Sequence, residues 1–240
     1  MTTNTSLGKL YLIPVTMGES DPMDVLPQTV KRTIELIDHY IVENEKTARK
    51  SIKGVLPEKK QSELVLFALN KHTDAKEHLS FIQPLLAGKN MGLMSEAGCP
   101  GVADPGAVIV KLAHEKGIQV IPLVGPSSIL LAMMASGMNG QSFTFNGYLP
   151  IDKGEKKSAL KNFEKLSFDK NQSQIFIETP YRNNKLLEDI LQALQPSTHL
   201  CIATDITLPT EYIKTLRVTD WKKTKVDLHN RPTIFIIHKM

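Results

Sequence analysis

Cysteine is scarce in this sequence, and its scarcity excludes a disulfide-based fold. Only Cys99 and Cys201 occur among the 240 residues, too few for the framework that stabilises small secreted domains. Long apolar runs are also missing, because the longest, near Ile129–Ala135, is far shorter than the roughly 18 residues of a membrane span. The start, MTTNTSLGKLYLIPV, has no basic segment and no apolar core of a secretory signal. We therefore expect a cytoplasmic protein that has no membrane partner.

Several motifs of common enzyme classes are missing as well. No GxGxxG follows the first apolar run and no GxxxxGKS/T occurs, which argues against the usual dinucleotide-binding and P-loop folds. The GxSxG motif of a nucleophilic serine is also missing. His72 and His78 have no cysteine or carboxylate at a familiar metal-binding spacing, so we expect no metal site. Cys99 has no adjacent histidine to activate it, and we interpret it as an ordinary loop side chain.

The charge balance is only mildly basic. The chain has 29 Lys+Arg and 25 Asp+Glu, a formal net charge of +4, which permits an acidic partner without requiring one. Lysines gather in the segment 153–165, where no tyrosine or tryptophan is interleaved with them. This segment is either an exposed helix with its loop or an RNA-facing edge, and Lys222-Lys223-Thr224-Lys225 is equally ambiguous.

In the first half of the chain, short apolar runs alternate with helical patterns. Helical spacing is seen in the first of these patterns, formed by Leu26, Val30, Ile34 and Ile37. Two further helices are expected, one over 73–86 with Thr73 as its N-cap and one over 107–116. The predicted strands are 10–15, 40–43, 63–69, 91–94 and 118–123. This alternation is typical of βαβ units with a parallel sheet.

The second half has a different pattern, which begins after Pro122, Gly125 and Pro126. Helices are expected over 129–136, with Ser127 as the cap, and over 182–194. The predicted strands are 174–178, 200–204, 212–218 and 233–238. Two of them follow each other with no room for a crossover helix, so some pairing is antiparallel. We predict an α/β protein with two α/β domains, 1–122 with a mainly parallel sheet and 126–240 with a mixed sheet.

The segment SEAGCPGVADPG, residues 95–106, is the strongest candidate for a ligand loop. It follows a predicted strand and is rich in glycine and proline, which let the main chain approach a ligand closely. The loops 14–21 and 43–49 follow other strands and would meet it at the carboxyl edge of the sheet. Four carboxylates at strand ends are candidate proton acceptors, namely Glu43, Glu96, Asp104 and Glu178. Glu43 is the first choice, and Asp104 is also a candidate cap of the helix from Ala107.

Four segments together carry a resemblance to a known family. LYLIPVTMGE, SEAGCPGVADPG, PLVGPSSILLAMMASG and FNGYLP, continued by IFIETPYR and CIATDIT, resemble the tetrapyrrole methylase family of S-adenosylmethionine-dependent methyltransferases. The likeness is greatest to members that methylate a cytidine ribose 2′-hydroxyl of 16S ribosomal RNA. It implies two α/β domains with the cofactor in a cleft between them, S-adenosyl-L-methionine as the cofactor, rRNA or the small ribosomal subunit as a partner, and a homodimer.

The resemblance also implies which residues meet the cofactor. It assigns Gly98, Cys99 and Pro100 to the cofactor loop, with Val102 just beyond it. The remaining assigned positions are Thr16, Ser127, Ser128, Glu178, Ala203 and Thr233. Arg49, Lys71 and Arg182 are either phosphate contacts or solvated surface charges.

This chain departs from the family pattern at several positions. The acidic residue after the second strand is replaced by Asn44, the loop SDAGTP reads SEAGCP, and Gly18-Glu19-Ser20 stands for Gly-Asn-Leu. The Lys-Gly-Glu before the last strand is replaced by Asn230-Arg231-Pro232. Two further functions therefore remain open: a methyltransferase that acts on a small molecule such as a tetrapyrrole, and a cofactor-binding protein that has lost catalysis.

Overall fold

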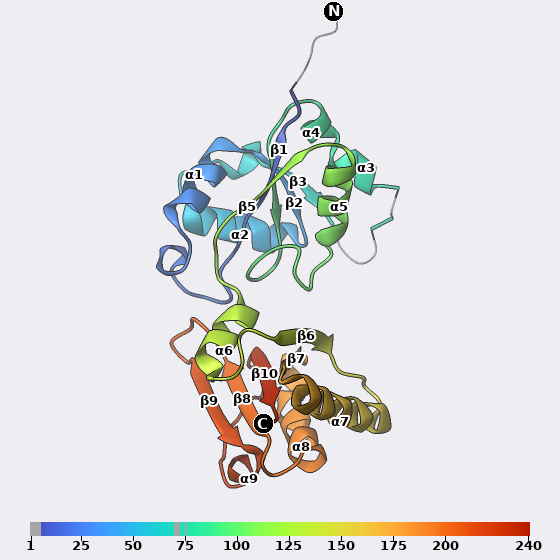
Figure 1. Ribbon diagram of the computed structural model, residues 1–240. Coiled ribbons are helices and arrows are strands. Elements are labelled where there is room, and N and C mark those ends of the chain that lie inside the picture. Colours follow the sequence, from blue (N-terminus) through green and yellow to red (C-terminus); the bar gives the residue numbers. More distant parts are fainter. Residues whose placement is uncertain (1–5, 70–72, 75) are drawn as a thin grey trace, which may run out of the picture. The chain divides into compact units, whose positions relative to one another are not determined.

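The computed structural model describes residues 6–69, 73–74 and 76–240 of the chain. These residues form two compact units, Met1–Ser127 and Ser128–Met240, and each has its own sheet (Figure 1). Within the described part of the chain, no helix is long and apolar enough to cross a membrane.

The first unit contains a five-stranded sheet whose strands are all parallel. The strand order is β3-β2-β4-β1-β5, and every pairing between neighbours is parallel. The strands are β1 (Lys9–Leu12), β2 (His39–Val42), β3 (Val65–Ala68), β4 (Met91–Met94) and β5 (Gln119–Pro122). The predicted parallel sheet is therefore confirmed, although strand β1 ends three residues earlier than predicted. Beyond it, Val15 forms only an isolated antiparallel bridge to Gly98.

Helices cover both faces of this sheet because alternate strand residues point to opposite sides. Tyr40 and Val42 lie in one buried cluster and Ile41 in another. The first face is covered by α1 (Gln28–Leu36) and α2 (Glu45–Val55), and the second by α3 (His78–Phe81), α4 (Gln83–Leu86) and α5 (Ala107–Glu115) (Figure 1). A parallel sheet buried on both faces explains the near-continuous apolar runs of its strands.

The single helix predicted over 73–86 is wrong. The segment forms two short helices, α3 and α4, separated at Ile82. Pro84 explains the break, because a proline inside a longer helix would lack its N–H and clash with the preceding turn. The N-cap of α3 is Glu77 rather than Thr73, whose hydroxyl is 3.5 Å from the carbonyl oxygen of Ala68.

The second unit contains a mixed sheet of order β6-β7-β10-β8-β9. Strand β6 is parallel to β7, whereas β10 is antiparallel to both β7 and β8, and β8 is antiparallel to β9. The predicted mixed sheet with some antiparallel pairing is therefore confirmed. The strands are β6 (Phe143–Tyr148), β7 (Ser173–Ile177), β8 (His199–Thr204), β9 (Tyr212–Arg217) and β10 (Thr233–His238). A sheet with β6 at its edge was not expected from the sequence.

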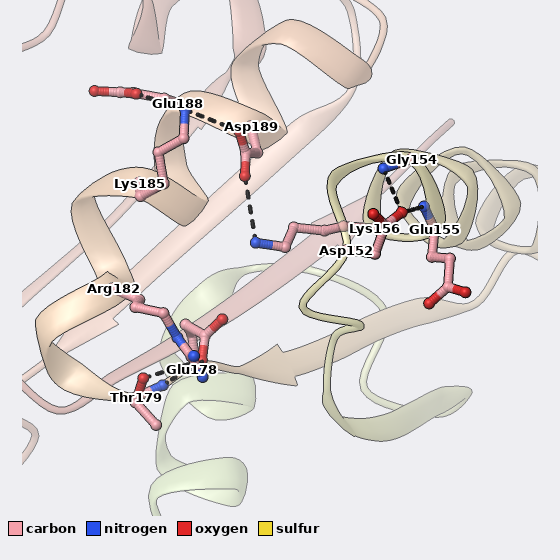
Figure 2. Close-up of polar contacts among 10 residues, drawn as sticks. All are labelled: Asp152, Gly154, Glu155, Lys156, Glu178, Thr179, Arg182, Lys185, Glu188 and Asp189. Atoms are coloured by element: carbon pink, nitrogen blue, oxygen red, sulfur yellow. Dashed lines mark hydrogen bonds and ion pairs between the residues drawn. The ribbon is translucent and has the colours of Figure 1, made fainter.

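Four helices accompany the mixed sheet. They are α6 (Ser128–Ser136), α7 (Lys153–Lys170), α8 (Asn183–Ala193) and the short α9 (Val218–Trp221). The Oδ1 of Asp152 caps α7 by accepting from the N–H groups of Gly154 at 2.8 Å and Glu155 at 2.9 Å (Figure 2). The buried Lys156 links α7 to α8 through an ion pair of 3.4 Å with Asp189 (Figure 2). The lysine-rich segment is thus a regular helix with one lysine turned inward.

Candidate active site

The carboxyl ends of the parallel strands in the first unit bring the candidate loops together. The connection after β2 leads to β3 on one side, and the connection after β4 leads to β5 on the other. Such a divergence between neighbouring strands leaves a crevice at the sheet edge, which is where α/β proteins usually bind ligands. The residues that follow these two strands are Glu43 and Ser95.

The loop after β4 is held in a fixed shape by Asp104. Its Oδ2 accepts a hydrogen bond from the N–H of Gly101 at 2.8 Å, and its Oδ1 accepts one from the N–H of Gly106 at 2.6 Å. The loop needs this support because Gly98, Gly101 and Ala103 all have a positive φ, of 69°, 83° and 59°. Helix α5 has no side-chain cap, so Asp104 stabilises the loop rather than capping the helix.

The same loop contacts the loops after β1 and β5. The N–H of Val15 donates to the carbonyl oxygen of Gly98 at 3.0 Å, and the thiol of Cys99 donates to the carbonyl oxygen of Pro126 at 3.3 Å. A Cβ on Gly125 would lie 2.2 Å from the Cβ of Pro14, so only glycine allows this approach. The predicted cofactor loop is therefore part of a tightly packed assembly of three loops.

Glu43 lies at the centre of a group of carboxylates. Burial raises the pKa of Glu43, and the negative charges of Glu96 and Asp104 raise it further, while a hydrogen bond from the N–H of Glu96 opposes them. A carboxylate with a raised pKa that stays partly exposed is suited to accept a proton from a reacting hydroxyl. Among the described residues, no group of three or more His, Cys, Asp or Glu side chains could hold a metal ion.

A cavity of about 650 Å³ opens beside this group, between the β1 loop and α2. Thr16 and Glu96 line it, and Lys50 forms an ion pair of 2.6 Å with Glu19 at its wall. The hydroxyl of Thr47 is 3.5 Å from Oε1 of Glu96. Thr16 and the carboxylate group therefore share one edge of the first unit, together with a space large enough for a small ligand or a nucleotide.

Helix α2 supplies part of this cavity, and the sequence analysis did not predict it. The Oδ1 of Asn44 caps the helix by accepting from the N–H groups of Lys46 at 3.0 Å and Thr47 at 3.2 Å. The signal was present, because an asparagine cap precedes apolar residues at helical spacing, Ala48, Ile52 and Val55, which are buried. Lys50 and Thr47 are the site residues that were missed with it.

The structure also shows where the other assigned residues of the first unit lie. Gly98 and Pro100 are buried in the loop after β4, whereas Val102 is 52% exposed at its tip. Ser127 ends the unit after the β5 loop. Arg49 donates from Nη1 to the carbonyl oxygen of Gln61 at 2.6 Å, so it supports the main chain rather than an open phosphate site. Lys71 and His72 lie outside the described residues.

The assigned residues of the second unit lie at three places in its fold. Ser128 is the first residue of α6. Ala203 in β8 and Thr233 in β10 are buried in neighbouring strands, and the hydroxyl of Thr233 donates to that of Thr204 at 2.9 Å. Ala203 lies near the end of β8 and Thr233 begins the antiparallel β10, so both residues lie at the same end of the sheet.

Glu178 follows β7, and its carboxylate is occupied by contacts within the unit (Figure 2). Oε1 accepts from the N–H of Thr179 at 2.7 Å and from Nη2 of Arg182 at 2.7 Å. Burial raises the pKa of Glu178, but these hydrogen bonds and the charge of Arg182 outweigh it, so the pKa lies below its ordinary value. Glu178 and Arg182 therefore hold each other, which makes Glu178 a poor proton acceptor.

A comparison with family models shows to which protein family the chain belongs. The model described as Tetrapyrrole (Corrin/Porphyrin) Methylases matches residues 9–221, which include every site residue discussed above except Thr233. The chain belongs to the tetrapyrrole methylase family. It is therefore a methyltransferase by family, and the resemblance inferred from its sequence is confirmed.

Individual relatives of this tetrapyrrole methylase cover most of its length. A protein of Buchnera aphidicola subsp. Schizaphis graminum named ribosomal RNA small subunit methyltransferase I is 28% identical, over 96% of this chain and 78% of the relative. The protein of that name from Escherichia coli O157:H7 is 29% identical, over 88% of this chain and 69% of the relative. A solved structure of uroporphyrin-III C-methyl transferase from Thermus thermophilus, complexed with S-adenyl homocysteine, has a TM-score of 0.57 and 16% identity, over 97% of this chain and 98% of that chain.

Proposed function

We propose that this methylase transfers a methyl group from S-adenosyl-L-methionine to a ribose 2′-hydroxyl of small-subunit ribosomal RNA. The observation that carries the proposal is the likeness, over 96% and 88% of the chain, to two bacterial proteins named ribosomal RNA small subunit methyltransferase I. The ribose hydroxyl as acceptor follows from the sequence resemblance. A homodimer and a cytoplasmic location are part of the same proposal.

The loop after β4 fits the cofactor. Gly98 and Gly101 have the positive φ that brings the main chain to the surface of a ligand, and a Cβ on Gly101 would meet nothing within 4 Å. S-adenosylmethionine supplies a methyl group activated by a positively charged sulfur. The main chain of Gly98, Cys99 and Pro100 would hold this cofactor, with Thr16, Val102 and Ser127 nearby. Ser128, Glu178, Ala203 and Thr233 remain predicted contacts from the second unit.

Glu43 is proposed as the group that receives or polarises the proton of the acceptor hydroxyl. Its raised pKa increases its basicity, and its place at the end of β2 puts it beside the loop that we assign to the cofactor. The enzyme's remaining task is to align donor and acceptor away from water, because methyl transfer is an in-line displacement. Asp104 contributes by fixing the loop through its two main-chain hydrogen bonds.

The acceptor is tested by a transfer assay. Small ribosomal subunits from cells that lack the modification are incubated with the protein and methyl-labelled S-adenosylmethionine, and the labelled nucleotide is identified by digestion and mass spectrometry. A label on a ribose 2′-oxygen is the expected result. Cofactor binding without any transfer to RNA would overturn the proposed substrate.

The cofactor loop is tested by calorimetry with S-adenosylhomocysteine. Gly98→Val is expected to lose detectable binding, since the side chain would crowd the carbonyl oxygen of Pro126, which lies 3.3 Å from a Cβ at this position. Gly117→Val is the matched control, because Gly117 has nearly the same φ, 70° against 69°, but follows the C-cap of α5 outside the loop. Equal affinity in the two variants would refute the placement of the cofactor.

A tetrapyrrole acceptor is the second candidate, favoured by the family's description and the 650 Å³ cavity beside Thr16. Transfer to a porphyrinogen or corrinoid but not to RNA would establish it. A non-catalytic role has lost part of its support. Asn44, whose departure from the family pattern suggested it, has a structural purpose as the cap of α2.

A further inference from the structure

The second unit contains a groove that lies outside the candidate active site. Its volume is about 720 Å³, and it runs between the end of α7 and the connection from α8 to β8. Its lining includes Lys161, Lys165, Phe168, Pro196 and Lys239. All of these residues belong to the second unit, so the groove is complete within that unit.

The groove is cationic because its lysines are not neutralised. Lys161 and Lys165 are exposed, and among the described residues neither forms an ion pair or a hydrogen bond through its side chain. In the part of the chain that the structure describes, Nζ of Lys239 contacts two neutral oxygens, Oε1 of Gln195 at 2.7 Å and Oγ of Ser197 at 2.6 Å. These three lysines therefore keep their charge available for an anionic ligand.

Glu164 is the acidic residue in the groove's lining; it offsets one of the three positive charges and leaves the lysines in excess. Glu164 is buried, and its Oε1 accepts hydrogen bonds from the N–H of Gln195 at 2.8 Å and from the hydroxyl of Thr198. Its role is to fasten α7 to the segment after α8. The carboxylate is thus engaged with the protein, and the lysines line the opening.

An aromatic ring lies on the same face of α7 as the lysines. Lys161, Lys165 and Phe168 are spaced by four and three residues, which places them in one stripe along the helix. Phe168 is 61% exposed, although burial would be favourable for a ring of this size. The N–H of Lys239 donates to the hydroxyl of Ser167 at 2.9 Å, which fixes the third lysine beside this stripe.

We propose that this groove binds a single-stranded segment of the RNA substrate, with phosphates at the lysines and an unpaired base stacked on Phe168. A cationic groove with an exposed aromatic ring is the usual construction for single-stranded nucleic acid. The inference rests on the proposed function, because it says where the proposed RNA substrate binds. It also gives the lysine-rich segment a role, since the exposed ring of Phe168 lies three residues beyond Lys165.

The charge contribution is tested by fluorescence anisotropy with a labelled single-stranded RNA oligonucleotide and the full chain. The double variant K161Q/K165Q removes two phosphate contacts, each worth about 0.7 in the slope of log affinity against log salt. The loss of affinity between 50 and 200 mM salt should therefore be about sevenfold smaller than in the wild type. K116Q/K214Q is the matched control, because it also removes two exposed lysines, and both lie outside the groove.

The stacking contribution is tested with Phe168. Phe168→Ala should weaken RNA binding about tenfold through the loss of one stacked base, whereas Phe168→Tyr keeps the ring and should bind like the wild type. Alanine favours helix, so the fold of α7 is not put at risk. If Phe168→Ala and Phe168→Tyr weakened RNA binding equally, the proposed stacking would be wrong. If both lysine double variants changed the salt slope equally, the groove would not be the RNA-binding site.

Two further outcomes separate this proposal from the proposed function. If K161Q/K165Q and Phe168→Ala methylated ribosomal subunits with an unchanged KM, the proposed RNA binding in the groove would be wrong, while the proposed methyltransferase function would still hold. RNA binding that depends on the groove, without any methyl transfer, would support the groove and refute the function. A change in oligomeric state in these variants, measured by sedimentation, would assign the groove to a second copy of the chain instead.

Discussion

At the scale of single residues, the environment of Glu43 predicts the pH dependence of the reaction. A proton acceptor works when deprotonated, so activity should fall as pH drops through the raised pKa of Glu43, above the ordinary value of about 4.3. Glu96→Gln removes a neighbouring negative charge, so the acidic limb of kcat/KM should move to lower pH. Glu43→Gln should lower kcat about 10²- to 10⁴-fold. Glu58→Gln is a control at an exposed glutamate, and it should change neither kcat nor the pH of the acidic limb. Wild-type activity in Glu43→Gln would exclude it as the proton acceptor.

At the scale of elements, the cap of α2 should matter for both stability and the site. Asn44→Ala removes the acceptor of two main-chain hydrogen bonds and should lower the free energy of unfolding by about 1 kcal/mol. Asn44→Asp keeps the acceptor and should retain stability in urea titrations. Because α2 carries Thr47 and Lys50 at the cavity, Asn44→Ala should also raise KM. Equal stability of the two variants would contradict the capping role.

The elements also show what the sequence could predict. The parallel sheet and the loop 95–106 were predictable because buried runs and glycine-rich turns are local signals. Strand β6 was missed because its pairing with β7 shifts register between Phe145 and Tyr148 and Gly147 has a φ of 65°, which disturbs the alternation. The contacts of Asp104 and Glu178 were not predictable, since they depend on loop conformation. Glu43 was chosen from the sequence because it ends a short apolar run, and its role as proton acceptor stays a prediction.

At the scale of the whole molecule, each unit has its own hydrophobic core. Phe235 stacks on Phe176 in the second unit, with ring centroids 6.0 Å apart, whereas Leu10 lies in a core of the first unit. Both side chains are fully buried. Since the buried clusters share no residues, damage to one core should remain within its unit.

Hydrogen exchange followed by mass spectrometry checks this expectation. Phe235→Ala should cost about 3–5 kcal/mol and reduce the protection of β7, β8 and β10, while β1 and β4 keep theirs. Leu10→Ala, which costs about 2–5 kcal/mol, should give the reverse pattern. If either variant lowered protection equally in both sheets, the two units would unfold as one cooperative structure.

With S-adenosylhomocysteine bound, protection should rise in the loop 95–106, because a ligand stabilises the folded state that it binds.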